Sequence, residues 1–300
     1  MKIGNVKLAS NLILAPMAGF TDVAHRSICR EFGAGLTVTE MVSVNAIFFD
    51  RTKKGTLKLL KTEPNEKPCS VQLFGNNPER FKEVLQYPEF KKFDIIDINM
   101  GCPAKKITRN KEGGFLMTDM VLAEKIIRTC VEYANRPVTV KFRIGYGTND
   151  NNCVEFAKMC EKAGVSAITL HARTAAQGYS GTADWTKIAE VKKAIKIPVI
   201  ANGDIVDLKS LEECKRITNA DGFMIGRASV GKPWIFAMSD VPVDIKTLAL
   251  KYIAILKKND VYLFHEAKKH VSALMPKELK KQVITAKDEF EMFKVLSLLN

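Results

Sequence analysis

Short apolar segments with strand-forming composition recur at regular intervals along residues 12–226 of this chain. Longer segments between them match crossover helices, and several follow Asp, Asn or Thr in cap-like positions. The apolar segments are Leu12–Met17, Leu36–Met41, Ser70–Phe74, Ile95–Asn99, Val138–Arg143, Ala167–His171, Pro198–Asn202 and Gly222–Gly226. The clearest helical segments are Thr118–Ala134, Asn152–Ala163, Thr186–Ala194 and Leu208–Ile217. This alternation predicts a parallel sheet covered on both faces, and eight such units predict an α/β fold of the (β/α)8 TIM-barrel type.

An open doubly wound sheet is the competing architecture. It is disfavoured because no Gly-x-Gly-x-x-Gly turn follows any of the apolar segments. After Pro242 the pattern changes to helical periodicity, as in Leu248–Leu256 and Val261–Leu274. We therefore predict two domains, a barrel over residues 1–240 and a helical C-terminal domain over residues 241–300.

Net charge is the second constraint. The chain carries a net charge of +13. Residues 241–300 hold 11 Lys and Arg against 7 Asp and Glu, so their net positive charge per residue is nearly twice that of the rest. This charge favours a polyanionic partner, and Lys268-Lys269-His270 with Lys277, Lys280 and Lys281 would track phosphates. A lysine-rich solvated surface explains the same charge equally well.

Cysteine usage and hydropathy exclude other classes of protein. The seven cysteines are scattered, odd in number and without a Cys-x-x-Cys pair, so we expect neither a disulfide framework nor a metal site. No apolar run approaches the roughly 18 residues needed to span a bilayer. We therefore expect a cytoplasmic protein without a membrane segment, and the sequence makes no prediction of oligomeric state.

The active site of a (β/α)8 barrel lies at the carboxyl ends of its strands. The polar or small residues at these ends are Pro16, Met17, Ala18, Gln72, Asn99, Cys102, Lys141, Arg143, His171 and Arg173. After the seventh and eighth strands come Asn202-Gly203-Asp204 and Gly226-Arg227, and loops at these positions commonly bind phosphate. The polar lining suits a flat cofactor rich in heteroatoms, such as a flavin, whose reduced form Lys141 would stabilise. Alternatively, Lys141 belongs to a rim ion pair and His171 is a satisfied core histidine.

Cys102 lies in a tight turn directly after the fourth strand, in Asn99-Met100-Gly101-Cys102-Pro103. The cations Lys105, Lys106 and Arg109 follow it. These neighbours would suit a nucleophilic thiolate, while a thiol of ordinary pKa would suit a general acid. A buried structural cysteine is the third reading.

Several motifs, taken in order, have a specific match. They are Leu14-Ala15-Pro16-Met17-Ala18-Gly19 with Thr21-Asp22, Val71-Gln72-Leu73-Phe74-Gly75, Asp97-Ile98-Asn99-Met100-Gly101-Cys102-Pro103, Val140-Lys141-Phe142-Arg143, His171-Ala172-Arg173-Thr174, Tyr179-Ser180-Gly181 with Ala183-Asp184-Trp185, Asn202-Gly203-Asp204 and Gly226-Arg227. Through them the chain resembles the flavin-dependent tRNA-dihydrouridine synthases along nearly its whole length.

This resemblance implies an FMN-dependent oxidoreductase that reduces the C5–C6 bond of uridines in tRNA, with NADPH as reductant. It implies noncovalent FMN held by Pro16, Met17, Ala18, Gln72, Lys141, His171, Asn202, Gly203, Asp204, Gly226 and Arg227. Hydride would pass from flavin N5 to C6, and Cys102 would donate a proton to C5 of a base flipped out of the RNA stack. The helical C-terminal domain and the basic residues around the mouth of the barrel would bind tRNA. The residues that we select as tRNA contacts are Asn99, Lys105, Lys106, Arg109, Arg173, Lys268 and Lys269.

The chain departs from the usual family pattern in three places, one of them a pair of residues. His25 stands where Phe is frequent, Phe115 where a small residue is common, and Ala273-Leu274 replace an aromatic pair. We expect these departures to leave the flavin site untouched. Two alternatives share the fold: a dihydroorotate-type flavin oxidoreductase acting on a free pyrimidine, and a non-catalytic RNA-binding barrel.

Overall fold

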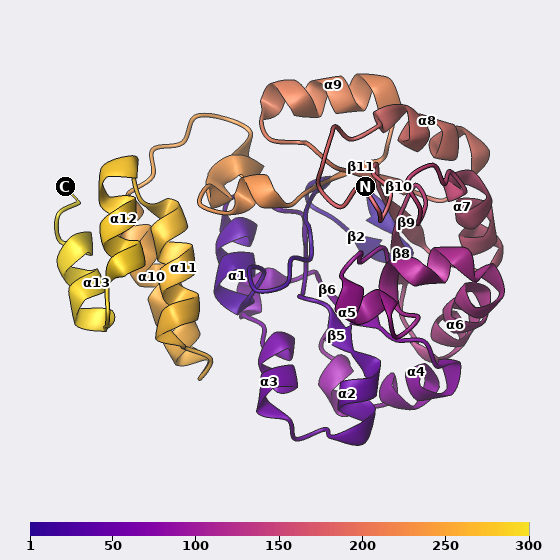
Figure 1. Ribbon diagram of the computed structural model, residues 1–300, viewed down its shortest axis with the longest axis horizontal. Coiled ribbons are helices and arrows are strands. Elements are labelled where there is room, and N and C mark those ends of the chain that lie inside the picture. The colour runs from indigo at the N-terminus through magenta and orange to yellow at the C-terminus, as the bar shows by residue number, and fades with distance from the viewer. Residues whose placement is uncertain (300) are drawn as a thin grey trace.

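A closed barrel of parallel strands dominates the computed structural model, which describes residues 1–299 (Figure 1). Its strands are β3 (Leu12–Leu14), β4 (Leu36–Val38), β6 (Cys69–Phe74), β7 (Ile95–Met100), β8 (Val138–Arg143), β9 (Ala167–His171), β10 (Val199–Asn202) and β11 (Gly222–Ile225). Neighbouring strands pair in parallel, and the pairing of β11 with β3 closes the ring. Each predicted apolar segment overlaps one of these strands, so the predicted barrel is confirmed.

The longer helices cover the outside of the barrel (Figure 1). They are α1 (Val23–Glu31), α4 (Pro78–Val84), α6 (Met120–Tyr133), α7 (Cys153–Lys162), α8 (Trp185–Ala194) and α9 (Leu208–Thr218). Side chains of Asp22, Asn77, Asp119, Asp184 and Asp207 accept a first-turn N–H at five of the starts. The four helical segments chosen from sequence are all present, with bounds that differ by at most two residues. Three shorter helices lie in the loops: α2 (Val44–Phe49), α3 (Lys54–Leu57) and α5 (Lys105–Thr108).

Apolar side chains fill the amino-terminal end of the barrel interior. Ile13, Ile95 and Ile200 from the strands meet Ile3 and Leu8 there, in one buried cluster. Ile3 belongs to a small hairpin formed by β1 (Lys2–Ile3) and β2 (Val6–Lys7). This plug leaves only the carboxyl ends of the strands open to form a cavity. The short strand β5 (Val42–Ser43) extends the pairing of β6 at that open end.

Four helices follow the barrel and pack on one side of it, next to α1 (Figure 1). They are α10 (Ile245–Lys258), α11 (Phe264–Leu274), α12 (Lys277–Thr285) and α13 (Glu289–Leu296). Their buried cluster includes Tyr252 and Val271, and α1 contributes Val23, Ala24 and Ile28 to it. These helices therefore share a core with α1. In the described part of the chain, no helix is long and apolar enough to cross a membrane.

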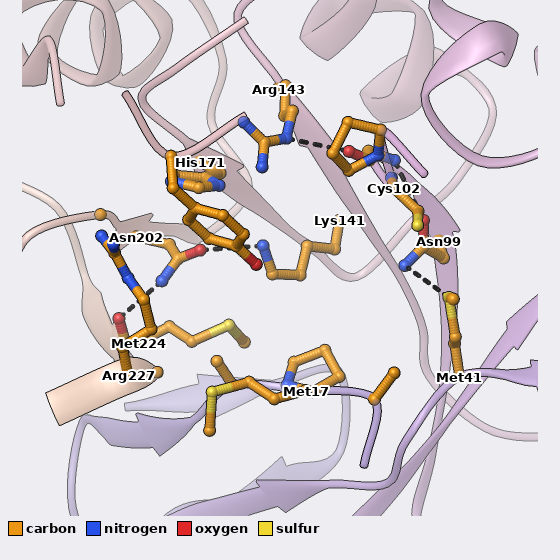
Figure 2. A pocket seen from close by; sticks show the side chains of 18 of the residues that line it. Met17, Met41, Asn99, Cys102, Lys141, Arg143, His171, Asn202, Met224 and Arg227 are labelled. Carbon is orange, nitrogen blue, oxygen red and sulfur yellow. Dashed lines mark hydrogen bonds between the residues drawn. The ribbon is translucent and has the colours of Figure 1, made fainter. Parts of the chain in front are cut away.

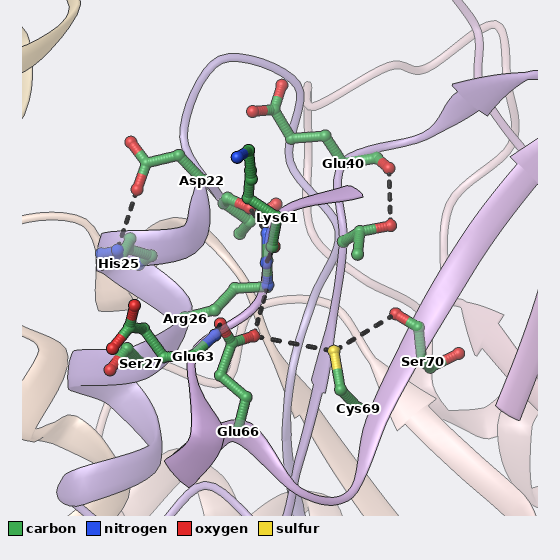
Figure 3. A network of polar contacts seen from close by, with 12 residues as sticks. Asp22, His25, Arg26, Ser27, Glu40, Lys61, Glu63, Glu66, Cys69 and Ser70 are labelled. Carbon is green, nitrogen blue, oxygen red and sulfur yellow. Dashed lines mark hydrogen bonds and ion pairs between the residues drawn. The ribbon is translucent and has the colours of Figure 1, made fainter. Parts of the chain in front are cut away.

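A buried ion pair joins α1 to the loop before β6 (Figure 3). Arg26 Nε lies 2.8 Å from Glu66 Oε2, and both side chains are 1% exposed. The Arg26 guanidinium also donates to the carbonyl oxygens of Thr21 (2.7 Å) and Lys61 (2.5 Å). Cys69, the first residue of β6, lies with its sulfur 3.6 Å from Glu66 Oε2. Arg26 thus fixes the start of β6, the third strand of the barrel, relative to α1.

We predict that Arg26→Met lowers the free energy of unfolding by about 3–5 kcal/mol, because the Glu66 carboxylate is left buried without its partner. Urea unfolding at pH 7 measures this change. Arg51→Met is the matched control, since its pair with Glu89 is 44% and 28% exposed, and it should cost at most about 1 kcal/mol. Equal effects of the two substitutions would contradict the structural role of Arg26.

Candidate active site

A cavity of about 630 Å³ opens at the carboxyl ends of the barrel strands (Figure 2). Its volume lies within the range of cofactor and substrate pockets. The structure brings to its wall every residue selected from sequence for the cofactor, together with Cys102 and Asn99. These are Pro16, Met17, Ala18, Gln72, Asn99, Cys102, Lys141, His171, Asn202, Gly203, Asp204, Gly226 and Arg227. The strand ends thus converge as a closed barrel requires, while the roles of these residues stay predictions.

Among the further residues that line the cavity, none of them assigned a role from sequence, are Met41, Arg143, Tyr179 and Met224. Met41 and Arg143 end predicted strands, so strand-end position alone was a signal for both. Met224 lies within β11 at an interior-facing position. Tyr179 lies in a loop after β9, is 60% exposed, and has its ring 4.7 Å from the Arg227 guanidinium carbon. No periodicity marks such a loop residue.

The turn that carries Cys102 is held from two sides. Asn99 Oδ1 accepts from the backbone N–H groups of Cys102 (2.9 Å) and Gly101 (3.2 Å). Arg143 Nε donates to the Gly101 carbonyl oxygen at 2.9 Å, and the Gly114 N–H donates to the Cys102 carbonyl oxygen at 2.9 Å. Cys102 is half-buried, whereas the other six cysteines are buried. The thiol is therefore the accessible one, on a rigid turn.

A chain of buried hydrogen bonds holds the Asn99 side chain in place from the interior of the barrel. Gln72 Nε2 donates to Asp97 Oδ2 at 2.6 Å, and Asn99 Nδ2 donates to Gln72 Oε1 at 2.8 Å. The Thr139 hydroxyl donates to the other Asp97 oxygen at 2.6 Å. The ionised Asp97 carboxylate at one end of this chain can only accept hydrogen bonds, and the Cys102 N–H at the other end can only donate one. These two ends fix which way the side-chain amides of Gln72 and Asn99 are turned. Burial raises the pKa of Asp97 to about 6, which leaves it mainly ionised at neutral pH.

Cations line the part of the cavity wall next to Asn99, because Lys141 of β8 pairs in register with Asn99 of β7. Lys141 Nζ donates to Asn202 Oδ1 at 2.8 Å, and burial, with Arg143 nearby, lowers the pKa of Lys141 to about 7. Burial and then the charges of Lys141, Arg143, Arg173 and Arg227 hold the pKa of His171 far below its usual value. The imidazole is therefore neutral at physiological pH. An anion entering the cavity would relieve this repulsion and favour protonated Lys141.

The loop after β10 has little space for side chains. Gly203 has φ +121°, and a Cβ there would lie 2.9 Å from Ala183 Cβ and 3.1 Å from His171 Cδ2. Next to it, the Asp204 carboxylate accepts from Arg173 at 2.9 and 2.7 Å and from Arg227 at 3.1 Å. The Asp204 carboxylate also accepts from the Ala183 N–H at 2.8 Å. Its oxygens are thus occupied by protein donors, one of which is Arg227 at the cavity wall.

The residues selected for tRNA separate into three groups. Lys105, Lys106 and Arg109 are exposed in and just after α5, beside the Cys102 turn. Lys269 is exposed, donates to the Gly19 carbonyl oxygen and lies 4.1 Å from the Phe20 ring, whereas half-buried Lys268 donates to Ala286 O at 2.9 Å. Asn99 is buried, and its amide serves the Cys102 turn.

Arg173, which was also selected for tRNA, lies inside the protein rather than on its surface. Its side chain is 2% exposed, and its nitrogens donate to Asp204, Ser180 O (3.1 Å) and Gly181 O (2.7 Å). The loop after β9 folds over the guanidinium and uses it as an internal support. Sequence does not distinguish an exposed arginine from a buried one, so only the path of this loop shows that Arg173 is buried. Over residues 1–299 no group of three or more His, Cys, Asp or Glu residues is placed to hold a metal ion.

Comparison with solved structures shows the fold. Histamine dehydrogenase from Rhizobium sp. 4-9 superposes with a TM-score of 0.61 at 13% identity, over 85% of this chain and 50% of that one. An old yellow enzyme homologue from Zymomonas mobilis gives 0.58 at 12% identity, over 78% of this chain and 89% of that one.

Sequence relatives are much closer. A probable tRNA-dihydrouridine synthase of Rickettsia conorii is 44% identical over 240 residues, covering 80% of this chain and 72% of the relative. The tRNA-dihydrouridine synthase B of Vibrio cholerae is 39% identical over 286 residues, covering 91% and 88%. The family model described as Dihydrouridine synthase (Dus) matches residues 13–293. The resemblance noted from sequence motifs is thereby confirmed, and this chain belongs to the dihydrouridine synthase family.

Proposed function

We propose that the chain is a tRNA-dihydrouridine synthase that uses FMN and NADPH to reduce the C5–C6 bond of uridines in tRNA. Family membership supports the reaction class and a flavin cofactor. The observation that carries the proposal is the placement of the half-buried Cys102 thiol and the Lys141 ammonium in one cavity. A cytoplasmic location stays a prediction.

The residues of the cavity fit FMN in size and charge. Gly203 lets the loop pack against Ala183 and His171 at the cavity wall, where a Cβ has no room, and Arg227, placed by Asp204, offers a forked donor for a phosphate. Lys141 lies on the strand next to the one that ends at the Cys102 turn and would be positively charged beside a bound anion. Gln72, with its amide orientation fixed, presents a defined polar edge. When bound, FMN would supply the hydride for C6 of uracil.

Cys102 then has the properties of a proton donor for C5. Burial raises the pKa of the thiol, and this effect outweighs the opposing effects of the Ala104 N–H and the charges of Arg143 and Lys141. The thiol is therefore protonated at neutral pH. A nucleophilic cysteine needs the opposite shift, towards the thiolate. The structure thus favours the general-acid role among the three that the sequence left open.

For tRNA we propose the exposed cations beside the Cys102 turn, Lys105, Lys106 and Arg109, and the helices of residues 241–300 as a tRNA-binding domain. The base must leave the RNA stack to reach a cavity at the barrel mouth. Lys269 lies between the two surfaces, because its ammonium contacts Gly19, next to the cavity residue Ala18. Both surfaces would then contact one RNA.

The deciding experiment measures flavin binding and dihydrouridine formation with the purified protein. We expect the protein to bind FMN and to form dihydrouridine in unmodified tRNA when NADPH is added, detected by mass spectrometry of nucleosides. Reduction of a free pyrimidine without reduction of tRNA would instead support the dihydroorotate-type alternative. Binding of tRNA without binding of FMN would support a non-catalytic RNA-binding barrel.

We predict that Cys102→Ala retains FMN binding and flavin reduction by NADPH but lowers dihydrouridine formation by about 10²–10⁴-fold, the usual contribution of a positioned acid. Single-turnover oxidation of the reduced enzyme by tRNA measures the loss. The matched control is Cys214→Ala, at a buried position of α9 away from the cavity, which should keep full activity. Full activity of Cys102→Ala would refute the acid assignment.

The raised thiol pKa makes a separate prediction that needs no flavin. Iodoacetamide should label Cys102 first, since the other six cysteines are buried. Because only the thiolate reacts, the labelling rate should be low at pH 7 and should rise with a midpoint above the ordinary thiol value of about 8.5. Peptide mass spectrometry across pH 6–10 measures it. A midpoint below neutrality would indicate an activated nucleophile instead.

For the RNA surface we predict that Lys105→Ala/Lys106→Ala weakens tRNA binding and reduces the slope of log affinity against log salt by about 2, one unit for each lost phosphate contact. The control pair Lys158→Ala/Lys162→Ala removes the same charge from exposed positions of α7. Filter binding at several salt concentrations compares the two. Identical slopes would place the RNA elsewhere.

A further inference from the structure

A buried hydrogen bond links α1 to the turn after β11, outside the cavity wall. His25 Nε2 lies 3.1 Å from Ser229 Oγ, and the two side chains are 4% and 0% exposed. Neither residue lines the cavity. From the sequence we expected the departure at His25 to leave the flavin site untouched; the bond to Ser229 argues against this, because it reaches the turn that begins at Gly226.

Ser229 closes that turn on itself. Residues Arg227–Ser229 form a 3-10 turn, and both the N–H (2.9 Å) and the hydroxyl (2.8 Å) of Ser229 donate to the Gly226 carbonyl oxygen. A hydroxyl has one proton, so the Ser229 oxygen is left to accept from His25. Burial, with the nearby charge of His270, lowers the pKa of His25 to about 3, so the ring is neutral. Its single N–H is then on Nε2.

The backbone of His25 is fixed by a different partner. Its N–H donates to Asp22 Oδ1 at 2.9 Å, and the other Asp22 oxygen accepts from the Tyr252 hydroxyl and lies 3.5 Å from His270 Nε2. The His25 and His270 rings are 5.6 Å apart. The imidazole is therefore held between the Gly226 turn and the C-terminal helices, with little freedom to move away from Ser229.

We propose that His25 is a positioning residue which, through Ser229, holds the Gly226–Ser229 turn in the conformation that receives the phosphate of the cofactor. This inference rests on the proposed function, in which Gly226 and Arg227 bind the FMN phosphate. Its consequence is specific to the phosphate. Riboflavin has the same ring system without that group, so its binding should not depend on the His25–Ser229 bond.

The test titrates the apoprotein with FMN and with riboflavin, following the quenching of flavin fluorescence. His25→Phe keeps an aromatic ring but removes the donor, and should raise the Kd for FMN about five- to tenfold, the worth of one buried hydrogen bond, while changing that for riboflavin less than about twofold. Ser229→Ala should act in the same direction. The double variant should be no weaker than the weaker single one, because both substitutions break the same bond.

Two further variants separate positioning from packing. His25→Gln retains an N–H donor and should recover most of the FMN affinity that His25→Phe loses. Cys29→Ala removes a second neighbour of the same imidazole, whose sulfur lies 3.5 Å from Nε2, but keeps the Ser229 bond, so FMN affinity should stay at the wild-type value.

The outcomes distinguish this inference from the proposed function. Equal losses of FMN and riboflavin, or no loss of FMN affinity in either His25→Phe or Ser229→Ala, would overturn the positioning role alone. A wild-type protein that binds riboflavin and FMN equally would overturn the phosphate role of the turn. A wild-type protein that binds neither would overturn the proposed function itself.

Discussion

Closure of the parallel sheet, through the pairing of β11 with β3, is the constraint on which the rest of the molecule depends. In a closed barrel every second side chain of each strand points inward, so one strand contributes to several interior layers. Along β7, Ile95 belongs to the apolar plug, Asp97 to the hydrogen-bonded middle and Asn99 to the cavity wall. The intervening Ile96 and Ile98 pack towards the helices. The interior of the barrel therefore becomes more polar towards the cavity. The alternation of side chains along each strand selects the inward-facing residues, and closure of the sheet brings them together in layers.

The cavity is preorganised for an anion at some cost to the ligand-free protein. Lys141, Arg143, Arg173 and Arg227 all act on His171, while Asp97 and Asp204 are the nearby carboxylates bonded into the site. Arg143 and Arg173 donate hydrogen bonds to backbone carbonyl oxygens. These bonds hold the two guanidinium groups in place, so that they do not move apart despite their like charge. A bound anion stabilises the folded state by mass action, so this arrangement couples ligand binding to stability.

Helix α1 distributes its contacts in three directions, because successive residues of a helix point about 100° apart. Arg26 faces the barrel loop that holds Glu66, and Val23, Ala24 and Ile28 face the C-terminal helices. His25 faces the turn after β11. The segment directly before α1 carries the cavity residues Pro16, Met17 and Ala18. One short helix thus connects the cavity, the barrel wall and the C-terminal helices.

Much of the fold and the cavity wall was predictable, because strand and helix periods are local and strand ends converge once a barrel is assumed. The family followed from the ordered motifs around Cys102 and Lys141. Neither argument could place Arg173 inside, orient the Asp97–Gln72–Asn99 chain, or bring His25 against Ser229, 204 positions away in the chain. The sequence by itself determined which strand ends reach the mouth of the barrel, since alternation and spacing suffice for that, whereas a loop residue such as Tyr179 was placed there only by the tertiary structure. Only the tertiary structure decided which of them are free to act on a ligand and which hold others in place, because burial and hydrogen-bond partners arise from contacts between distant segments.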